Sequence, residues 1–334
     1  MVAFVAGLAF SAKAGNWPSW RGDVAGSGIV RGEKIPLEWG TKKNVRWRVP
    51  LPDRGNSSPI VWGDKVFITQ ATDSDKRRTV MCFDKRTGEL LWRTGVTYTK
   101  AEKTHKTNPY CSGSPAIDGR VVVANYASAG VAAYDLEGQQ LWHRELGPQD
   151  HIWGNGTSPV LFGDLCIVYH GPGPRSSLHA LDKLSGRTVW KRKVEEKDDP
   201  NRVDGFRGAN GGINGAFTTP IIIEVQGRHE LILSEANTLR ALSPEDGSEL
   251  WRCNGLNPLI YTSPVYDGKL VLSLGGYFGA SIAVKPGGSG DVTAKRLWHD
   301  PRSKKNRLGT PVVREDFAYF VNMSGFMECI DMKS

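Results

Sequence analysis

The sequence has little that would support redox or metal chemistry. Its five cysteines stand far apart, with no adjacent pair, no CxxC and no CxxCH, so the usual zinc, dithiol and c-type haem motifs are excluded. Beyond the first ten residues, no apolar run approaches the ~18 residues that a membrane-spanning helix needs. With 39 glycines and 19 prolines, the chain is interrupted too often for long helices. These absences predict a soluble mature protein built from short strands.

The first residues resemble an export signal. Residues 2–10 are apolar, and Ala12-Lys13-Ala14 has the small-x-small pattern of a signal-peptidase site. No basic segment precedes the apolar run, so a strand or a soluble helix is the alternative. We predict a signal peptide at 1–14, an N-terminal extension at 15–43, and a periplasmic or secreted protein.

The rest of the chain repeats one unit six times. Each unit begins with Ser-Pro or Thr-Pro, followed by a short apolar strand, usually a Gly/Asp hairpin turn, and a β-branched second strand. A third strand that often ends in Asp precedes a glycine turn, and the fourth strand carries a tryptophan. Cys82, Cys166 and Cys329 fall inside the apolar strands, which predicts buried thiols. The units begin at Ser58-Pro59, Ser114-Pro115, Ser158-Pro159, Thr219-Pro220, Ser263-Pro264 and Thr310-Pro311.

Four short antiparallel strands cannot bury both faces of their own sheet, so successive sheets must stack. Radial stacking around an axis gives a β-propeller, in which the tryptophan fills the space between adjacent blades. The predicted fold class is therefore all-β, a β-propeller of four-stranded antiparallel blades over residues 44–334. The repeat tryptophans are Trp47, Trp92, Trp142, Trp190, Trp251 and Trp298.

The third strand and its turn carry a family resemblance. The stretches that end at Trp92, Trp142 and Trp190 follow the A-x-D-x-x-[ST]-G-x-x-x-W pattern of the pyrroloquinoline-quinone (PQQ) repeat, and the chain resembles that family from about residue 44 to 334. Two units depart from the pattern, with Ser243 and Lys285 in place of the Asp. We expect altered turns in those two blades.

The resemblance implies seven or eight blades, whereas six are visible in the sequence. We therefore predict a fragment whose last blade or blades are incomplete. The segment NVRWRVPL, residues 44–51, looks like a fourth strand without its first three, as expected if the N-terminus completes the last blade. The alternative is that this Trp47 strand completes blade six and closes a six-bladed ring.

The loops before the first strands should meet at one mouth of the central channel. Every loop contains an asparagine, which suits either loop geometry or ligand contact. Basic and aromatic side chains beside them favour an anionic or polyhydroxylated ligand, and a ligand-free polar mouth is the alternative. No nearby carboxylate accompanies the histidines, so we assign no metal ligand and no catalytic residue. The candidate ligand residues are Arg54, Asn56, His105, Lys106, Asn108, Tyr110, His151, Trp153, Asn155, Asn214, Tyr261 and Arg307.

An acidic stretch from Glu195 to Asp204 interrupts the repeat between the third and fourth units. It faintly resembles a calcium loop, but a loop begun at Asp199 would need a glutamate where Asn210 stands. We prefer a solvated insertion between blades.

Three functions fit these observations. The first is a scaffold or binding module without a cofactor, whose partner is an envelope protein or a polar or anionic ligand and not nucleic acid; we expect a monomer. The second, implied by the resemblance, is a dehydrogenase of alcohols or sugars that uses PQQ and calcium, although the adjacent cysteines and haem motif of such enzymes are missing. The third is a hydrolase or lyase at the channel mouth, with His105, His151 and Tyr110 as acid–base candidates. The net charge of +8 fits an ordinary solvated surface best.

Overall fold

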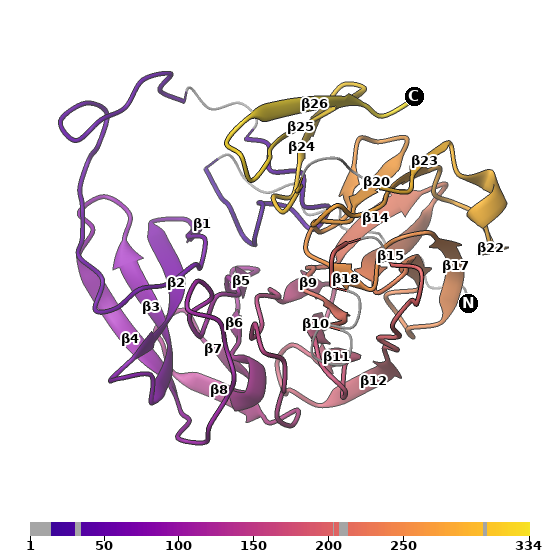
Figure 1. Ribbon diagram of the computed structural model, residues 1–334. Coiled ribbons are helices and arrows are strands. Elements are labelled where there is room, and N and C mark those ends of the chain that lie inside the picture. Colours follow the sequence, from indigo (N-terminus) through magenta and orange to yellow (C-terminus); the bar gives the residue numbers. More distant parts are fainter. Residues whose placement is uncertain (1–14, 31–34, 203, 207–212, 303–305) are drawn as a thin grey trace, which may run out of the picture.

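The computed structural model describes residues 15–30, 35–202, 204–206, 213–302 and 306–334. Within them, six antiparallel sheets follow one another around a central space, with the first strands innermost and the later strands at the periphery (Figure 1). The predicted β-propeller is confirmed. The predicted signal peptide, 1–14, lies outside the described residues.

Each blade is a meander in which every strand pairs with the next. Blades 1 to 3 comprise β1 (Ile60–Trp62), β2 (Lys65–Thr72), β3 (Arg77–Asp84) and β4 (Leu90–Thr97); β5 (Ala116–Ile117), β6 (Val122–Asn125), β7 (Val131–Tyr134) and β8 (Gln140–Arg144); β9 (Val160–Phe162), β10 (Leu165–His170), β11 (Ser177–Asp182) and β12 (Thr188–Lys193). Blades 4 to 6 comprise β14 (Ile221–Val225), β15 (Arg228–Glu235), β16 (Thr238–Leu242) and β17 (Glu249–Asn254); β19 (Val265–Tyr266), β20 (Val271–Leu274), β21 (Ser281–Val284) and β23 (Trp298–Asp300); β24 (Val312–Arg314), β25 (Phe317–Val321) and β26 (Met327–Asp331). A short parallel pair, β13 (Gly215–Ala216) and β18 (Leu259–Ile260), joins the loops before blades 4 and 5.

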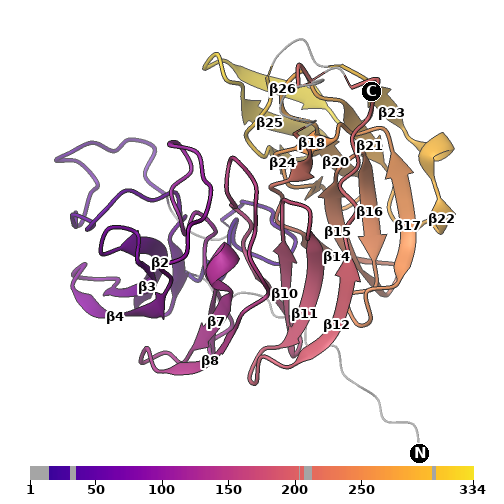
Figure 2. The same ribbon diagram turned by 60° about the horizontal axis from the view of Figure 1, so that its bottom comes forward.

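Burial explains the strand sequences. The middle strands are buried almost throughout because both of their faces meet a neighbouring blade, as in β10 and β11. The outer strand β12 is largely exposed, and only its Trp190 is buried. Figure 2 shows the sheets of blades 3 and 4 lying face to face, and their side chains form one shared core. The stacking that the repeat predicts is therefore the source of the core.

The Ser/Thr-Pro motifs form a belt of hydrogen bonds around the channel. The backbone N–H of Ser114 donates to the Ser158 hydroxyl at 3.0 Å, and the N–H of Ser158 donates to the Thr219 hydroxyl at 3.0 Å. The same bond recurs from Ser58 to Ser114, from Thr219 to Ser263 and from Ser263 to Thr310, at 2.8, 2.8 and 3.1 Å. Each hydroxyl belongs to the following blade. This hydroxyl belt explains why every unit begins with serine or threonine.

A second set of contacts joins the blades at the periphery. The indole N–H of Trp142 donates to the backbone carbonyl of Lys183 in the next blade at 3.0 Å, and its ring lies against Gly186. Trp47, Trp92, Trp190 and Trp298 make the same indole-to-carbonyl bond, to Lys85, Leu136, Pro244 and Met332. These tryptophans therefore bond to the blade that follows each of them in sequence.

Only one of the two expected turn changes occurs. In blade 4 the turn is kept, because Ser243 donates its N–H to Ser248 and accepts from Gly247 as Asp182 does with its own turn, so that prediction was wrong. In blade 5 the turn after Lys285 is replaced by an excursion, η3 (Thr293–Lys295) and β22 (Gly290–Asp291), which adds a parallel strand to β17. Trp251 accordingly donates to the buried Glu230 carboxylate at 2.7 Å instead of to a backbone carbonyl.

The predicted strand at 44–51 does not form. Trp47 and Val49 do pack on the outer face of blade 1, where an outer-strand tryptophan belongs, but no sheet accompanies them. Among the described residues blade 6 keeps three strands, so the six-bladed ring closed by this segment was wrong. The number of blades in a complete ring stays a prediction.

Residues 16–28 of the N-terminal extension cross the central channel. Trp17 pairs with Val61 of blade 1, and the carbonyl of Pro18 accepts from Ile117 of blade 2. Farther along, the carbonyl of Val24 accepts from Ile222 of blade 4, and Arg21 donates to the carbonyls of Thr310 and Pro311 of blade 6 at 3.2 and 2.5 Å. In Figure 1 this indigo segment lies between the innermost strands. This segment therefore connects blades that are distant in sequence.

All five cysteines are unpaired thiols, and Cys82 and Cys166 are buried as predicted. Cys329 is exposed, contrary to prediction, because the face of β26 that carries it meets no neighbouring blade among the described residues. None of the described helices is long and apolar enough to cross a bilayer.

The peripheral contact can be tested at Gly186. A Cβ at this position would lie 2.7 Å from the Trp142 ring on a backbone with φ +71°, so we expect Gly186→Ala to cost about 3 kcal/mol, from left-handed strain plus overpacking. Gly227→Ala is the matched control, because φ is +76° there and no atom lies within 4 Å; strain alone costs about 1 kcal/mol. Urea unfolding measures both. Equal losses would contradict the ring contact.

The hydroxyl belt can be tested at Ser158. Ser158→Ala leaves the buried N–H of Ser114 without its acceptor, and we expect the free energy of unfolding to fall by about 1–3 kcal/mol. Ser158→Thr should stay near the wild-type value, because threonine holds the same place in blades 4 and 6. If the alanine and threonine variants unfold at the same urea concentration, the belt is not a source of stability.

Candidate functional site

The loops before the first strands meet at one mouth, and their polar side chains bond mainly to one another's backbones. Asn108 donates to the carbonyls of Trp153 and Asn155 at 2.7 and 3.1 Å. Arg54 donates to the carbonyl of Lys106 at 2.8 Å, and Asn56 donates to that of Thr107 at 3.0 Å. These bonds join the mouth loops of blades 1, 2 and 3 into one surface.

His151 is held at both ring nitrogens. Its Nε2 lies 3.1 Å from the carbonyl of Asn214, and its Nδ1 accepts the N–H of Trp153 at 3.2 Å. Burial lowers the pKa of His151, against the hydrogen bond to Asn214, which raises it. The geometry therefore suits a neutral imidazole that positions two loops.

An aromatic cluster surrounds this histidine. Phe217 and Tyr261 stack with centroids 5.6 Å apart and a 6° interplanar angle, and Trp153 lies 6.1 Å from Tyr261. Phe206 and Tyr277 pack edge-on against Trp153 and Tyr261 at 5.2 and 5.4 Å. The Tyr261 hydroxyl has no partner among the described residues, and burial raises its pKa. The cluster gives the blade 3 to 5 side of the mouth an apolar wall.

The remaining predicted mouth residues do not join this cluster. His105 is exposed and contacts the Thr107 hydroxyl at 2.8 Å, while the Tyr110 hydroxyl donates to the Glu102 carbonyl and its ring lies 4.0 Å from the Arg78 guanidinium. Asn155 bonds to the carbonyl of Gly171. Arg307 pairs with Glu328 of its own blade at 3.2 Å.

The acidic insertion after blade 3 is organised by a buried arginine. All five N–H groups of Arg202 are used: two donate to Asp204 at 2.8 Å, and the others reach Asp198, the Asn214 side chain and the Ile213 carbonyl at 2.7, 2.9 and 2.8 Å. The guanidinium thus supplies the positive charge that offsets Asp198 and Asp204. Arg202, Phe206 and Phe217 are the site residues that sequence reasoning missed. The signal available was a lone arginine inside an acidic run.

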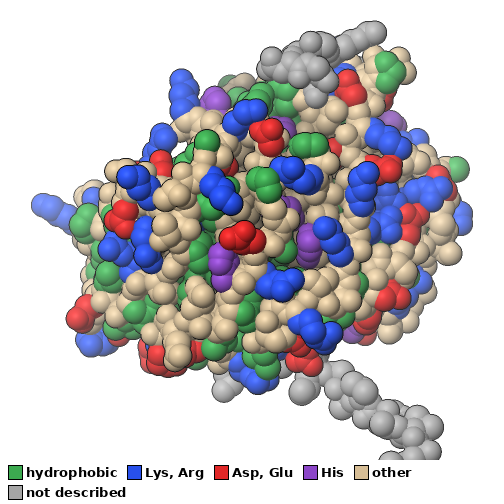
Figure 3. All heavy atoms as spheres, turned by 90° about the horizontal axis from the view of Figure 1, so that it is seen from below, with side chains coloured by type: hydrophobic (Ala, Val, Ile, Leu, Met, Phe, Trp, Pro, Cys, Tyr) green, Lys and Arg blue, Asp and Glu red, His purple; other side chains and the backbone are tan. Residues whose placement is uncertain are grey.

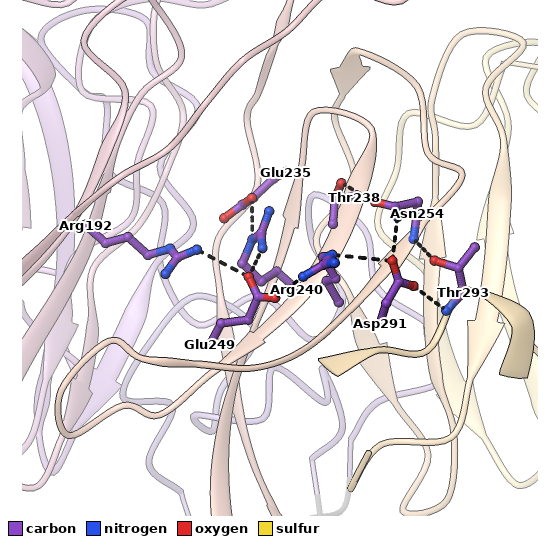
Figure 4. A network of polar contacts seen from close by, with 9 residues as sticks. Arg192, Glu235, Thr238, Arg240, Glu249, Asn254, Asp291 and Thr293 are labelled. Carbon is purple, nitrogen blue, oxygen red and sulfur yellow. Dashed lines mark hydrogen bonds and ion pairs between the residues drawn. The ribbon is translucent and has the colours of Figure 1, made fainter. Parts of the chain in front are cut away.

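A second charged network lies on blade 4 and reaches blades 3 and 5. Arg240 bonds to Glu235 at 2.8 Å and to Glu249, which also contacts Arg192 of blade 3 at 3.4 Å (Figure 4). Arg252 continues the network to Asp291 of the blade 5 excursion at 3.4 Å. Each carboxylate in it has a cationic partner, so the network joins blades and leaves no unpaired charge for a ligand.

The described residues hold no metal cluster, and the face drawn in Figure 3 has no surface of a single charge sign. Among the described residues, no three His, Cys, Asp or Glu side chains are grouped so that they could hold a metal ion. Figure 3 shows Lys and Arg side chains on one face scattered among acidic and neutral ones. The excess positive charge is therefore spread over that face.

The hydroxyl belt, the peripheral tryptophans and the six meander blades define a repeat propeller of the PQQ class. Residues 37–170 and 174–325 match the family model described as outer membrane protein assembly factor BamB. The chain belongs to this family.

Known proteins of two kinds are similar to it. The outer membrane protein assembly factor BamB of Alkalilimnicola ehrlichii is 24% identical over 222 residues, which is 66% of this chain and 49% of that protein. A polyvinylalcohol dehydrogenase of Sphingopyxis is 21% identical over 354 residues, 89% of this chain and 52% of that protein. The structure of a quinohemoprotein alcohol dehydrogenase from Pseudomonas putida superposes with a TM-score of 0.58 at 14% identity, over 86% of this chain and 48% of that one, and shows the fold alone. The chain spans about half the length of each.

The role of Arg202 can be tested by Arg202→Lys, which cannot make five directed bonds. We expect the free energy of unfolding to fall by about 3 kcal/mol, because the buried Asp204 loses its bidentate partner. Arg187→Lys, in an exposed turn, is the control and should change stability by less than about 0.5 kcal/mol. Tryptophan fluorescence should shift only in the first variant, since the insertion packs against Trp153. An unchanged unfolding curve would refute the organising role.

Proposed function

We propose that this chain is an interaction scaffold of the bacterial envelope, periplasmic or secreted, that works without a catalytic cofactor. The observation that carries the proposal is the bonding at the mouth. The side chains of Asn56, Asn108 and His151 form hydrogen bonds to backbone carbonyls of neighbouring loops. These bonds hold the loops in one fixed surface. Preformed surfaces lose little entropy on binding. The family match supports an assembly or interaction role of this kind.

The alternative is a PQQ- and calcium-dependent dehydrogenase. The similarity to the polyvinylalcohol dehydrogenase of Sphingopyxis supports it. Calcium requires six to eight oxygen ligands. Within the described residues two buried carboxylates near the mouth pair with arginines, Asp204 with Arg202 and Glu102 with Arg78 at 3.0 Å, and Glu196 accepts from Tyr169, Ser176 and Gly173. Residues 16–28 also cross the channel. The residues present do not fit this cofactor pair, and no catalytic step is assigned to them.

The hydrolase or lyase alternative has less support. His151 and the Tyr110 hydroxyl, two of its three acid–base candidates, are bonded to backbone carbonyls. No observation on the remaining candidate, the exposed His105, favours this chemistry.

Two measurements separate the scaffold from the dehydrogenase. Calorimetric titration with PQQ and calcium should give no stoichiometric binding, and a dye-linked assay with alcohols and sugars should give no turnover. Pull-down from envelope extract should capture a protein that is lost with Lys106→Glu at the mouth and kept with Arg187→Glu, an equivalent charge reversal at the outer edge. Stoichiometric PQQ binding with dye reduction would overturn the scaffold.

A further inference from the structure

A pocket of about 480 Å³ lies beside the mouth, on the top of blade 3. Its walls are the loop after β8, the β10–β11 loop, the continuation of β12 and the end of the acidic insertion. Ile152, Val194 and Ile213 supply apolar surface, and Glu196 lies in the wall. None of the mouth interactions described above uses Glu196.

The Glu196 carboxylate sits in a cradle built for it. Its Oε1 accepts from the hydroxyls of Tyr169 and Ser176, the latter at 2.7 Å, and its Oε2 accepts the N–H of Gly173 at 2.8 Å. A Cβ on Gly215 would lie 3.0 Å from Oε2 and 2.4 Å from the Pro172 side chain. Three elements of the fold therefore leave room for this one carboxylate and orient it.

Among the described residues, no lysine or arginine forms an ion pair with this carboxylate, although Lys193 and Lys197 also line the pocket. The other two acidic residues of the pocket have lysine partners: Asp150 pairs with Lys103 at 3.0 Å and Glu195 with Lys197 at 2.6 Å. Glu196 accepts only from neutral donors among the described residues. Burial, opposed by these hydrogen bonds, raises its pKa. A partly buried carboxylate without a counter-charge is costly to keep, and a cationic ligand would remove that cost.

We propose that this pocket receives an alkylammonium or guanidinium group, whose charge pairs with Glu196 and whose methylene groups lie against Ile152 and Ile213. The chemistry fits a lysine or arginine side chain of a partner protein and fits a free polyamine equally. The proposal rests on the scaffold function only for the choice between these sources. Binding of the group itself requires no partner.

The test is calorimetric titration of the protein with butylammonium, butylguanidinium, butanol and butyrate. We expect both cations to bind about tenfold or more tightly than butanol, and butyrate to bind least. Glu196→Gln should weaken the cations about tenfold, whereas Glu195→Gln, on the same rim, should change their affinity by less than about twofold. Equal binding of butanol and butylammonium would overturn the proposal.

A second variant covers the case in which Glu196→Gln does not fold. Ile152→Trp fills the pocket without altering any bond to Glu196 and should abolish cation binding, and Leu184→Trp, an exposed apolar position at the outer edge, should not. Binding to the wild-type protein should also be lost on acidification, at a higher pH than an ordinary glutamate would give, because the protonated carboxyl offers no charge. Cation binding that survives Ile152→Trp would refute the assignment.

Two further ligands identify the source. Tighter binding of an N-acetyl-lysine-methylamide peptide than of spermidine indicates a side chain on a partner, and the reverse order indicates a polyamine. If both ligands bind and the pull-down from envelope extract captures no protein, the result supports the proposed cation pocket and contradicts the proposed scaffold function.

Discussion

The hydrogen bond from one blade's Ser or Thr amide to the next blade's hydroxyl sets the geometry on which the rest depends. It fixes the inner end of each blade, and the tryptophan bond to the following blade fixes the outer end. A blade that is bonded to its neighbour at both its inner and its outer end has little freedom to rotate against that neighbour. The proline that follows each hydroxyl has no N–H to leave unpaired at the channel wall. The mouth loops therefore start from a rigid rim.

The repeat predicts the fold because its contacts are local or between neighbouring blades, and each such contact leaves a mark at a fixed spacing. The predictions failed where a neighbour is missing or replaced. Trp47 packs on blade 1, but its own segment belongs to no sheet. Ser243 keeps the aspartate turn because its hydroxyl accepts the N–H of Asp246, as the Asp182 carboxylate accepts that of Ser185. Cys329 has a buried-strand sequence on a face that no described blade covers.

The candidate site was less predictable because it depends on insertions. The positions of the loops in the repeat predicted Trp153 and Tyr261 as site residues. They did not predict that Phe206 and Phe217 complete the aromatic cluster, because no repeat spacing relates these residues. Arg202 and Glu196 lie in a stretch that composition describes only as acidic. In the folded insertion the five N–H groups of Arg202 are all bonded, whereas Glu196 has no ion pair among the described residues. The same fold can thus carry different sites on an unchanged rim.

The segment that crosses the channel also bears on the order in which contacts form during folding. Arg21 is among the earliest described residues to be synthesised, yet the carbonyl of Thr310 that it contacts follows 289 residues later. Contacts of such high sequence separation are slow to form. The first five blades can stack before Arg21 bonds to the carbonyls of Thr310 and Pro311. The bond between Arg21 and blade 6 therefore forms only after the five intervening blades have been synthesised.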